Sequence, residues 1–229
     1  MLDISGKWVL LTGASRGVGR QVAGALAEKG CHLILQSREL GHTARMVSEF
    51  QAIGLTVHAL EAELSDQAQV VALGEEALRI SGGVDILYND AAIQTGWHED
   101  KFATEPDEYR RSFQVNTLAP ITLSNMVLPG MIERGFGRVV CVTSGIKDQP
   151  QLMAYAASKA ALDKYVYDMA PHLAGTGVLL NLLDPGWLRT DLGGPQAPND
   201  VTSVLPGALA PVLIEDGTCG KWFSAQDYR

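Results

Sequence analysis

Short apolar runs alternate along the whole chain with longer stretches in which apolar residues recur at helical spacing. Their length and their Val, Ile and Leu content predict strands, and their continuous apolar character predicts strands covered on both faces. The runs are Trp8–Leu11, Cys31–Leu35, Leu55–Leu60, Val84–Tyr88, Arg138–Val142 and Val178–Leu183, and a seventh strand is expected near Gly220–Ser224.

Helical patterns fill the intervals between these runs. Gly17–Lys29 carries an apolar stripe beside a line of small residues, which is typical of a helix packed closely on a sheet. Two longer helices are expected over Pro106–Arg134 and Met153–Ala174. No linker or low-complexity segment interrupts the alternation. The pattern therefore predicts a single α/β domain over residues 1–229, with a Rossmann-type doubly wound parallel sheet in a three-layer α/β/α sandwich.

Composition and charge narrow the class of protein. With 229 residues, 46% of them hydrophobic, the chain can bury one large core. A net charge of −8 without a basic cluster argues against a nucleic-acid partner. Without an apolar stretch of about 20 residues or a signal peptide, we expect a cytoplasmic protein and no membrane contact. The wide spacing of Cys31, Cys141 and Cys219 predicts free thiols and no metal site.

A glycine-rich turn, Thr12–Gly19, follows the first strand and opens the first helix. Backbone N–H groups and the helix dipole at such a turn can hold a pyrophosphate, because glycine lets a ligand approach closely. A tight strand-to-helix connection is the alternative interpretation, and the position after the first strand favours a dinucleotide site. The expected contacts are Gly13, Ser15, Arg16, Gly17, Val18 and Gly19.

Tyr155 and Lys159 are four residues apart, so both side chains lie on one face of a predicted helix. A fixed ammonium group favours the phenolate, and we expect it to lower the tyrosine pKa from its usual value of about 10. The same spacing occurs on ordinary surface helices. Here it opens the helix after the fifth strand, at the sheet edge where α/β proteins bind ligands, which favours an acid/base role.

Several motifs in this order resemble the short-chain dehydrogenase/reductase family in its short single-domain form. They are the Thr12–Gly19 turn, Asn89–Ala92, Tyr155–Lys159 and Pro185–Thr190, and they cover essentially the whole chain. The extension Leu192–Pro195 is most similar to the carbonyl-reductase-like branch. The resemblance implies a nicotinamide cofactor and hydride transfer to or from a carbonyl group or secondary alcohol, with Tyr155 as acid/base.

The resemblance further implies a serine that orients the carbonyl oxygen, and Ser144 ends the matching strand. Only ten residues separate Ser144 from Tyr155, about two fewer than the family pattern, so Thr143 remains an alternative. It also implies that the main-chain carbonyl of Asn116 holds a water connected to the catalytic lysine. Pro120, four residues later, has no N–H to satisfy that carbonyl.

The cofactor contacts implied by the resemblance lie at the carboxyl ends of the predicted strands. Ser37 replaces the acid that would repel a 2′-phosphate, and Arg38 and Arg16 lie nearby, so we expect NADP(H) to be preferred over NAD(H). Glu39 argues the other way, but should point along the next helix. The contacts beyond the turn are Ser37, Arg38, Glu63, Leu64, Asn89, Ala91, Tyr155, Lys159, Pro185, Gly186, Trp187 and Thr190.

Two motif positions depart from the family. Glu63 stands where the family has a shorter Asp, and Asn89–Ala92 reads Asn-Asp-Ala-Ala instead of Asn-Asn-Ala-Gly. We expect substrate contacts from Gln94, Trp97, Ser144, Met153 and Trp187, although ordinary packing explains each as well. The leading function is a carbonyl reductase or alcohol dehydrogenase, and the alternatives are a 3-oxoacyl thioester reductase and a non-catalytic NADP-binding sensor or interaction protein. The two long helices resemble family dimer helices, which implies a homodimer or homotetramer.

Overall fold

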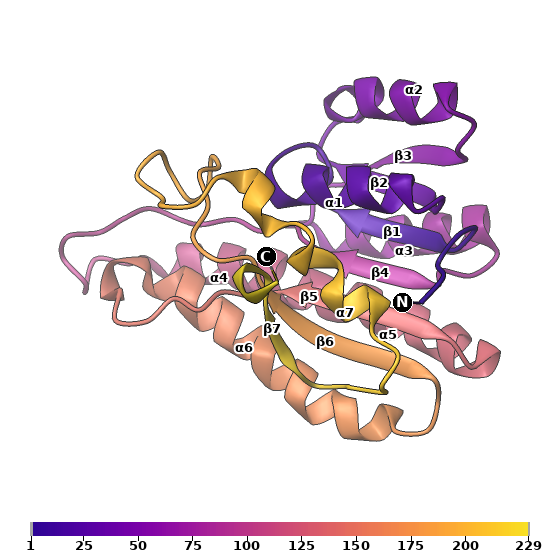
Figure 1. Cartoon of the computed structure of the whole chain (residues 1–229). Coiled ribbons are helices and arrows are strands. Elements are labelled where there is room, and N and C mark those ends of the chain that lie inside the picture. Colours follow the sequence, from indigo (N-terminus) through magenta and orange to yellow (C-terminus); the bar gives the residue numbers. More distant parts are fainter. Residues whose placement is uncertain (1, 229) are drawn as a thin grey trace.

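The computed structural model describes residues 2–228 and contains a seven-stranded sheet in the order β3-β2-β1-β4-β5-β6-β7 (Figure 1). All pairings between these strands are parallel within the described residues. The strands are β1 (Trp8–Thr12), β2 (His32–Ser37), β3 (Val57–Glu61), β4 (Ile86–Asn89), β5 (Gly137–Val142), β6 (Val178–Asp184) and β7 (Trp222–Ser224). This confirms the predicted Rossmann-type parallel sheet, including the seventh strand.

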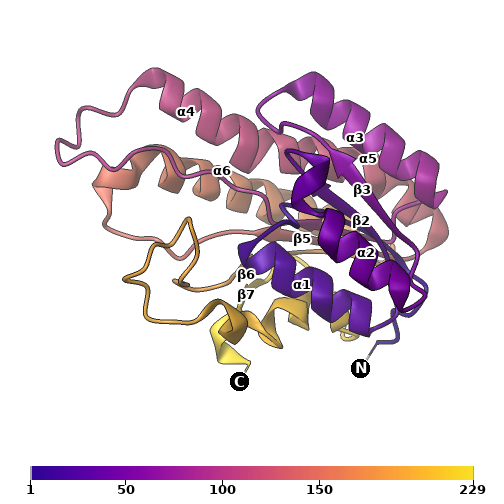
Figure 2. The same ribbon diagram turned by 90° about the horizontal axis from the view of Figure 1, so that it is seen from above.

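Helices cover both faces of the sheet and complete the three-layer sandwich (Figure 2). One face packs against α1 (Gly17–Glu28), α2 (Ala44–Ala52) and α7 (Ala210–Leu213). The opposite face packs against α3 (Gln67–Ser81), α5 (Ala119–Arg134) and α6 (Met153–Met169), and α4 (Pro106–Phe113) lies beside α6. Successive strand residues point to opposite faces, so Val9 and Leu11 enter one core and Leu10 the other.

The order in which successive strands are added to the sheet reverses at β1, which pairs with β2 on one side and with β4 on the other. Such a point opens a crevice at the carboxyl ends of the strands, where ligands bind in this class of fold. Thr12 at the end of β1 lies opposite Asn89 at the end of β4. The Thr12 hydroxyl accepts hydrogen bonds from the backbone N–H groups of Asp90 (3.1 Å) and Ala91 (3.2 Å), which fixes the two segments together.

The stretch Pro106–Arg134 is helical throughout, but it is not one regular α-helix. A π-helical turn, Gln114–Leu118, separates α4 from α5, and the Ala119 N–H donates to the Gln114 carbonyl. Within residues 2–228 this is the single helix long and apolar enough to cross a membrane, yet 56% of its most apolar window is buried. It packs against α3, α6 and the sheet, as a core helix does.

Candidate active site

Tyr155 and Ser144 come together because β5 ends at Val142 and α6 begins only eleven positions later. Their side chains are hydrogen-bonded to each other. The Ser144 Oγ also accepts from the Ile146 N–H (3.3 Å), so its hydroxyl proton remains available. Thr143 is 1% exposed and donates its hydroxyl to Asp163 (2.5 Å). The shortened loop therefore presents Ser144, and not Thr143, to the phenol.

Lys159 lies one helical turn below Tyr155 and is buried. Its ammonium group donates to the carbonyl of Val142 (2.7 Å) and lies 5.9 Å from the centre of the Tyr155 ring. Burial lowers the pKa of Lys159 to about 8, and the nearby Asp90, Cys141 and Asp163 counteract this shift. The predicted pair is thus assembled, with the cation held at the end of β5.

The Tyr155 pKa differs from the sequence-based expectation. Burial raises the pKa of the phenol to about 12, and the hydrogen bond to Ser144 opposes this rise. Three carboxylates raise it further: Asp184, Asp90 and Asp163. The expectation that the pKa lies below its usual value is wrong for this arrangement, because desolvation of the phenol outweighs the interaction that favours the phenolate. Tyr155 is consequently protonated at neutral pH.

Asn116 lies in the π-helical turn and is fully buried. Its Nδ2 donates to the Ile93 carbonyl (2.9 Å) and to the Ser158 Oγ (3.0 Å), while its Oδ1 accepts from the Ile93 N–H (2.9 Å). The side chain therefore ties the segment after β4 to α6, next to Lys159. The role of its main-chain carbonyl in holding a water stays a prediction.

The glycine-rich turn fits a dinucleotide phosphate. Gly13 and Gly17 have φ values of +70° and +56°, which favour glycine. A Cβ on Gly13 would lie 2.8 Å from the Ala91 Cα, and one on Gly19 only 2.3 Å from the Gly13 carbonyl oxygen. The side chain of Arg16, the N-cap residue of α1, makes no capping hydrogen bond, so N–H groups of the first turn can receive an anion.

The turn lies beside the segment that follows β6. A Cβ on Gly17 would lie 3.6 Å from the Thr190 Cγ2, and Arg16 forms an exposed ion pair with Asp191 (2.8 Å). Gly186, with φ +81°, donates its N–H to Asp184 (2.9 Å). The segment Pro185–Thr190 is thus held next to the glycine-rich turn, and its contact with a cofactor stays a prediction.

The residues proposed to distinguish NADP from NAD lie at the end of β2. Ser37 is buried and donates its hydroxyl to the Glu39 carbonyl (2.7 Å), while Arg38 is exposed. The Glu39 carboxylate lies 3.7 Å from His42, along the next helical turn as expected. After β3, Glu63 accepts hydrogen bonds from the N–H and the hydroxyl of Ser65, and Leu64 is buried.

The predicted substrate residues outside the catalytic group are all exposed: Gln94, Trp97, Met153 and Trp187. Trp97 and Trp187 are each 58% exposed, so core packing does not account for either indole. The Trp187 Nε1 donates to the Gly193 carbonyl (2.7 Å), which fixes this ring on its loop. Among residues 2–228, no group of three or more His, Cys, Asp or Glu side chains is arranged to hold a metal ion.

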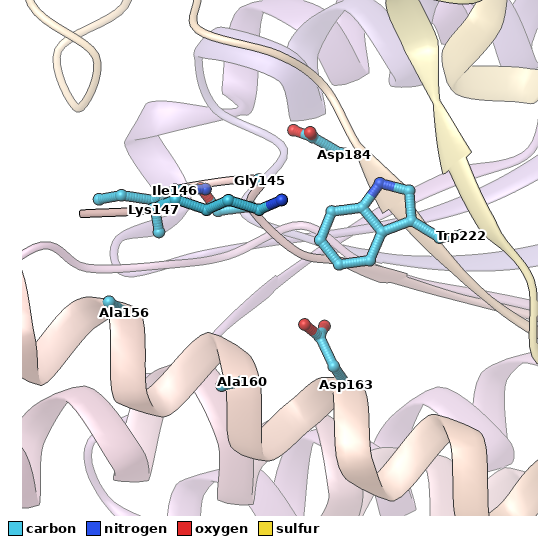
Figure 3. Close-up of a pocket in the computed structure, with 9 residues that line it drawn as sticks. Gly145, Ile146, Lys147, Ala156, Ala160, Asp163, Asp184 and Trp222 are labelled. Carbon is cyan, nitrogen blue, oxygen red and sulfur yellow. The ribbon is translucent and has the colours of Figure 1, made fainter. Parts of the chain in front are cut away.

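A cavity of about 500 Å³ lies next to Ser144, between α6 and β7 (Figure 3). Asp163 on α6 and Asp184 at the end of β6 point into it from opposite sides, beside the indole of Trp222. These three residues were not predicted from the sequence. A signal was present for the carboxylates, since Asp163 lies four residues after Lys159 and Asp184 ends a strand at the carboxyl edge. The lining comprises Ser144, Gly145, Ile146, Lys147, Ala156, Ala160, Asp163, Asp184 and Trp222.

Comparisons with known proteins give the family. The short chain dehydrogenase model matches residues 7–200. The ketoacyl reductase HetN of Nostoc sp. is 35% identical over 190 residues, covering 82% of this chain and 66% of HetN, slightly less than two thirds of that relative.

Solved structures agree over the full fold. The 3-oxoacyl (acyl-carrier-protein) reductase of Agrobacterium tumefaciens C58 with NADP bound is 28% identical with a TM-score of 0.85, covering 96% of this chain and 93% of that one. A blue fluorescent protein from a metagenomic library in complex with NADPH is 25% identical with a TM-score of 0.87, covering 97% of both chains. With its sheet order and assembled Ser-Tyr-Lys group, this chain belongs to the short-chain dehydrogenase/reductase family of oxidoreductases.

Proposed function

We propose that the protein is an NADP(H)-dependent carbonyl reductase in which Tyr155 exchanges the proton. The observation that carries this proposal is the hydrogen-bonded pair of Ser144 and Tyr155 above the buried Lys159. These groups and the glycine-rich turn all lie at the carboxyl edge of the sheet, after β5 and β1. A non-catalytic sensor or interaction protein would not need a protonated phenol and a hydroxyl donor aimed at one point.

Each residue has a defined task in this reaction. The nicotinamide, when bound, supplies or accepts the hydride. The Ser144 hydroxyl donates to the carbonyl oxygen of the substrate and stabilises the negative charge that develops there. Tyr155, protonated at neutral pH, gives its proton to that oxygen, and the buried Lys159 stabilises the phenolate left behind.

Support for NADP(H) over NAD(H) comes from the end of β2. Ser37 carries no charge that would repel a 2′-phosphate, and Arg38 beside it is exposed and available to bind one. Arg16 in the turn provides a second guanidinium group. Two of the similar solved structures carry NADP or NADPH, which is consistent with this choice.

The proposed substrate is a ketone or aldehyde, as in the carbonyl-reductase-like branch. A 3-oxoacyl thioester is the second candidate, because HetN is a ketoacyl reductase and one similar solved structure is a 3-oxoacyl reductase. NADPH consumption with ketones, aldehydes and acyl thioesters distinguishes the two.

We further propose a cytoplasmic homodimer or homotetramer joined through α5 and α6, where Ile132 and Tyr167 are exposed. Light scattering, which measures the mass of the assembly, distinguishes the dimer from the tetramer.

Replacing the phenol tests the proposal directly. We expect Tyr155→Phe to reduce kcat by more than a hundredfold with the best carbonyl substrate, because the transferable proton is lost. The dissociation constant of NADPH, measured by fluorescence titration, should change less than about threefold, since the aromatic ring is retained. Tyr165→Phe on the same helix is the matched control, and it should retain activity. Loss of activity by tenfold or less in Tyr155→Phe would contradict the assigned role.

A further inference from the structure

Asp90 stands where the family motif has a neutral Asn, directly after β4. Its backbone N–H donates to Thr12, and its carboxylate accepts a hydrogen bond from the N–H of Gly19 in the first turn of α1. A Cβ on Gly19 would lie 2.7 Å from the Asp90 Oδ2. The carboxylate is therefore packed directly against the glycine-rich turn and already binds one of its N–H groups.

Few charged groups face this carboxylate. Burial raises the pKa of Asp90 to about 7, while Lys159 on α6 and the N–H of Gly19 on α1 lower it. In turn, the negative charge of Asp90 raises the pKa values of Tyr155 on α6 and Tyr88 on β4. Asp90 thus lies between the catalytic cation and the helix N-terminus, and a small change in nearby charge alters its protonation at neutral pH.

The carboxylate and a dinucleotide compete for the same positive region. The N-terminus of α1 favours an anion, and a pyrophosphate at the turn brings negative charge close to Asp90. Like charges in a partly buried site repel strongly, because the local dielectric constant is lower than that of water. Protonation of the Asp90 carboxylate removes the repulsion. The oxygen that does not carry the proton can still accept the hydrogen bond from the Gly19 N–H.

We propose that Asp90 is a proton-binding site coupled to the cofactor site, taking up a proton from solvent when NADP(H) binds at the turn. The step forms one O–H bond on the Asp90 carboxylate and consumes one solvent proton, with no other bond changed. The inference rests on the proposed dinucleotide site. If binding takes up a proton, the affinity for the cofactor falls as pH rises through the neutral range. This fall adds to any change in affinity that comes from titration of the cofactor's own phosphates.

Calorimetric titration with NADPH at pH 7, in buffers of different ionisation enthalpy, counts the protons taken up. We expect the wild-type protein to take up a substantial fraction of one proton more than Asp90→Asn, which keeps the shape and an acceptor for Gly19. Between pH 6 and pH 8, the wild-type affinity should fall roughly five- to tenfold more than that of Asp90→Asn. Asp163→Asn is the matched control. Asp163 also interacts with Lys159, but its hydrogen bond goes to Thr143 and not to the glycine-rich turn.

The outcomes separate this inference from the proposed function. NADPH binding with equal proton uptake in wild type and Asp90→Asn overturns the inference and leaves the dinucleotide site intact. Failure of NADPH to bind at all overturns both. Equal loss of uptake in Asp163→Asn assigns the proton to Lys159 and overturns the role of Asp90. Should Asp90→Asn not fold, wild type is titrated with NADH, whose bridging phosphates do not titrate near pH 7. Uptake then supports the inference, and its absence overturns it.

Discussion

Ser144 and Thr143 are neighbouring hydroxyl residues directly after β5, but their partners differ. Ser144 is hydrogen-bonded to Tyr155, whereas Thr143 is buried and donates to Asp163. We expect Ser144→Ala to lower kcat about a hundredfold, the scale for losing one donor to a developing oxyanion. Thr143→Val, which removes the bond to Asp163, should lower stability while affecting kcat less. Steady-state kinetics and thermal melting of both variants make the comparison. A larger kcat loss in Thr143→Val would move the catalytic hydroxyl to Thr143.

We propose that the choice between NADP(H) and NAD(H) also depends on single residues, at the end of β2. We expect kcat/KM with NADPH to exceed that with NADH by at least about tenfold, since a hydrogen bond to a charged group contributes about 1.5–3 kcal/mol. Arg38→Ala should lower the ratio, and Ser37→Asp should reverse it by repelling the 2′-phosphate. Arg45→Ala, an exposed arginine on α2 paired with Glu49, is the control and should leave the ratio unchanged. Equal or better use of NADH by the wild type would point to Glu39 as the ribose acceptor.

The structure brings the predicted residues Ser144, Tyr155 and Lys159 together, but the pKa of Tyr155 is higher than the sequence-based expectation. The Tyr155–Lys159 spacing places both side chains on one helix face, which any α-helix would do. The pKa depends on burial and on Asp90 and Asp184, which reach the site from the ends of other strands. That distribution of charge follows from the packing of the chain, so local spacing could not predict it.

At the scale of elements, two of the three glycines of α1, Gly19 and Gly24, have very different surroundings. A Cβ on Gly19 would meet the Gly13 carbonyl oxygen at 2.3 Å, whereas one on Gly24 meets nothing within 4 Å. We expect Gly19→Ala to lower stability by about 1–3 kcal/mol and to abolish NADPH binding. Gly24→Ala should raise stability by up to about 1 kcal/mol, because alanine favours the helix. Thermal melting and fluorescence titration test both variants. Tolerance of Gly19→Ala would show that the turn is less tightly packed.

The helical stretch Pro106–Arg134, which precedes β5, was predicted only in part. Apolar periodicity over Pro106–Arg134 indicated one long helix, and Pro120 indicated a disturbance. The structure resolves the disturbance as a π-helical turn at Gln114–Leu118, in which the buried Asn116 side chain reaches Ile93 and Ser158. A π-turn depends on such tertiary contacts, and periodicity therefore could not reveal it.

For the whole molecule, the alternation of apolar runs and helices was enough to predict the parallel sheet and its layers. Strand ends were less exact, because β2 continues through Ser37 and β4 through Asn89, two polar residues that carry no hydrophobic signal. The cavity beside Ser144 was not predicted either. It is formed by α6, β6 and β7 together, and Trp222 enters it from more than sixty positions beyond Tyr155.

The pairing of β1 with β4 affects how the molecule holds together over time. Val9 on β1 pairs with Ile86 on β4. This pairing joins the half of the sheet that contains β1, β2 and β3 to the half that contains β4, β5, β6 and β7. The glycine-rich turn follows β1 and Asp90 follows β4, so the two borders of the crevice belong to different halves. A ligand held by both borders binds only the joined state and suppresses transient opening between the halves by mass action. We therefore expect the chain to be cleaved by proteases more readily without that ligand than with it.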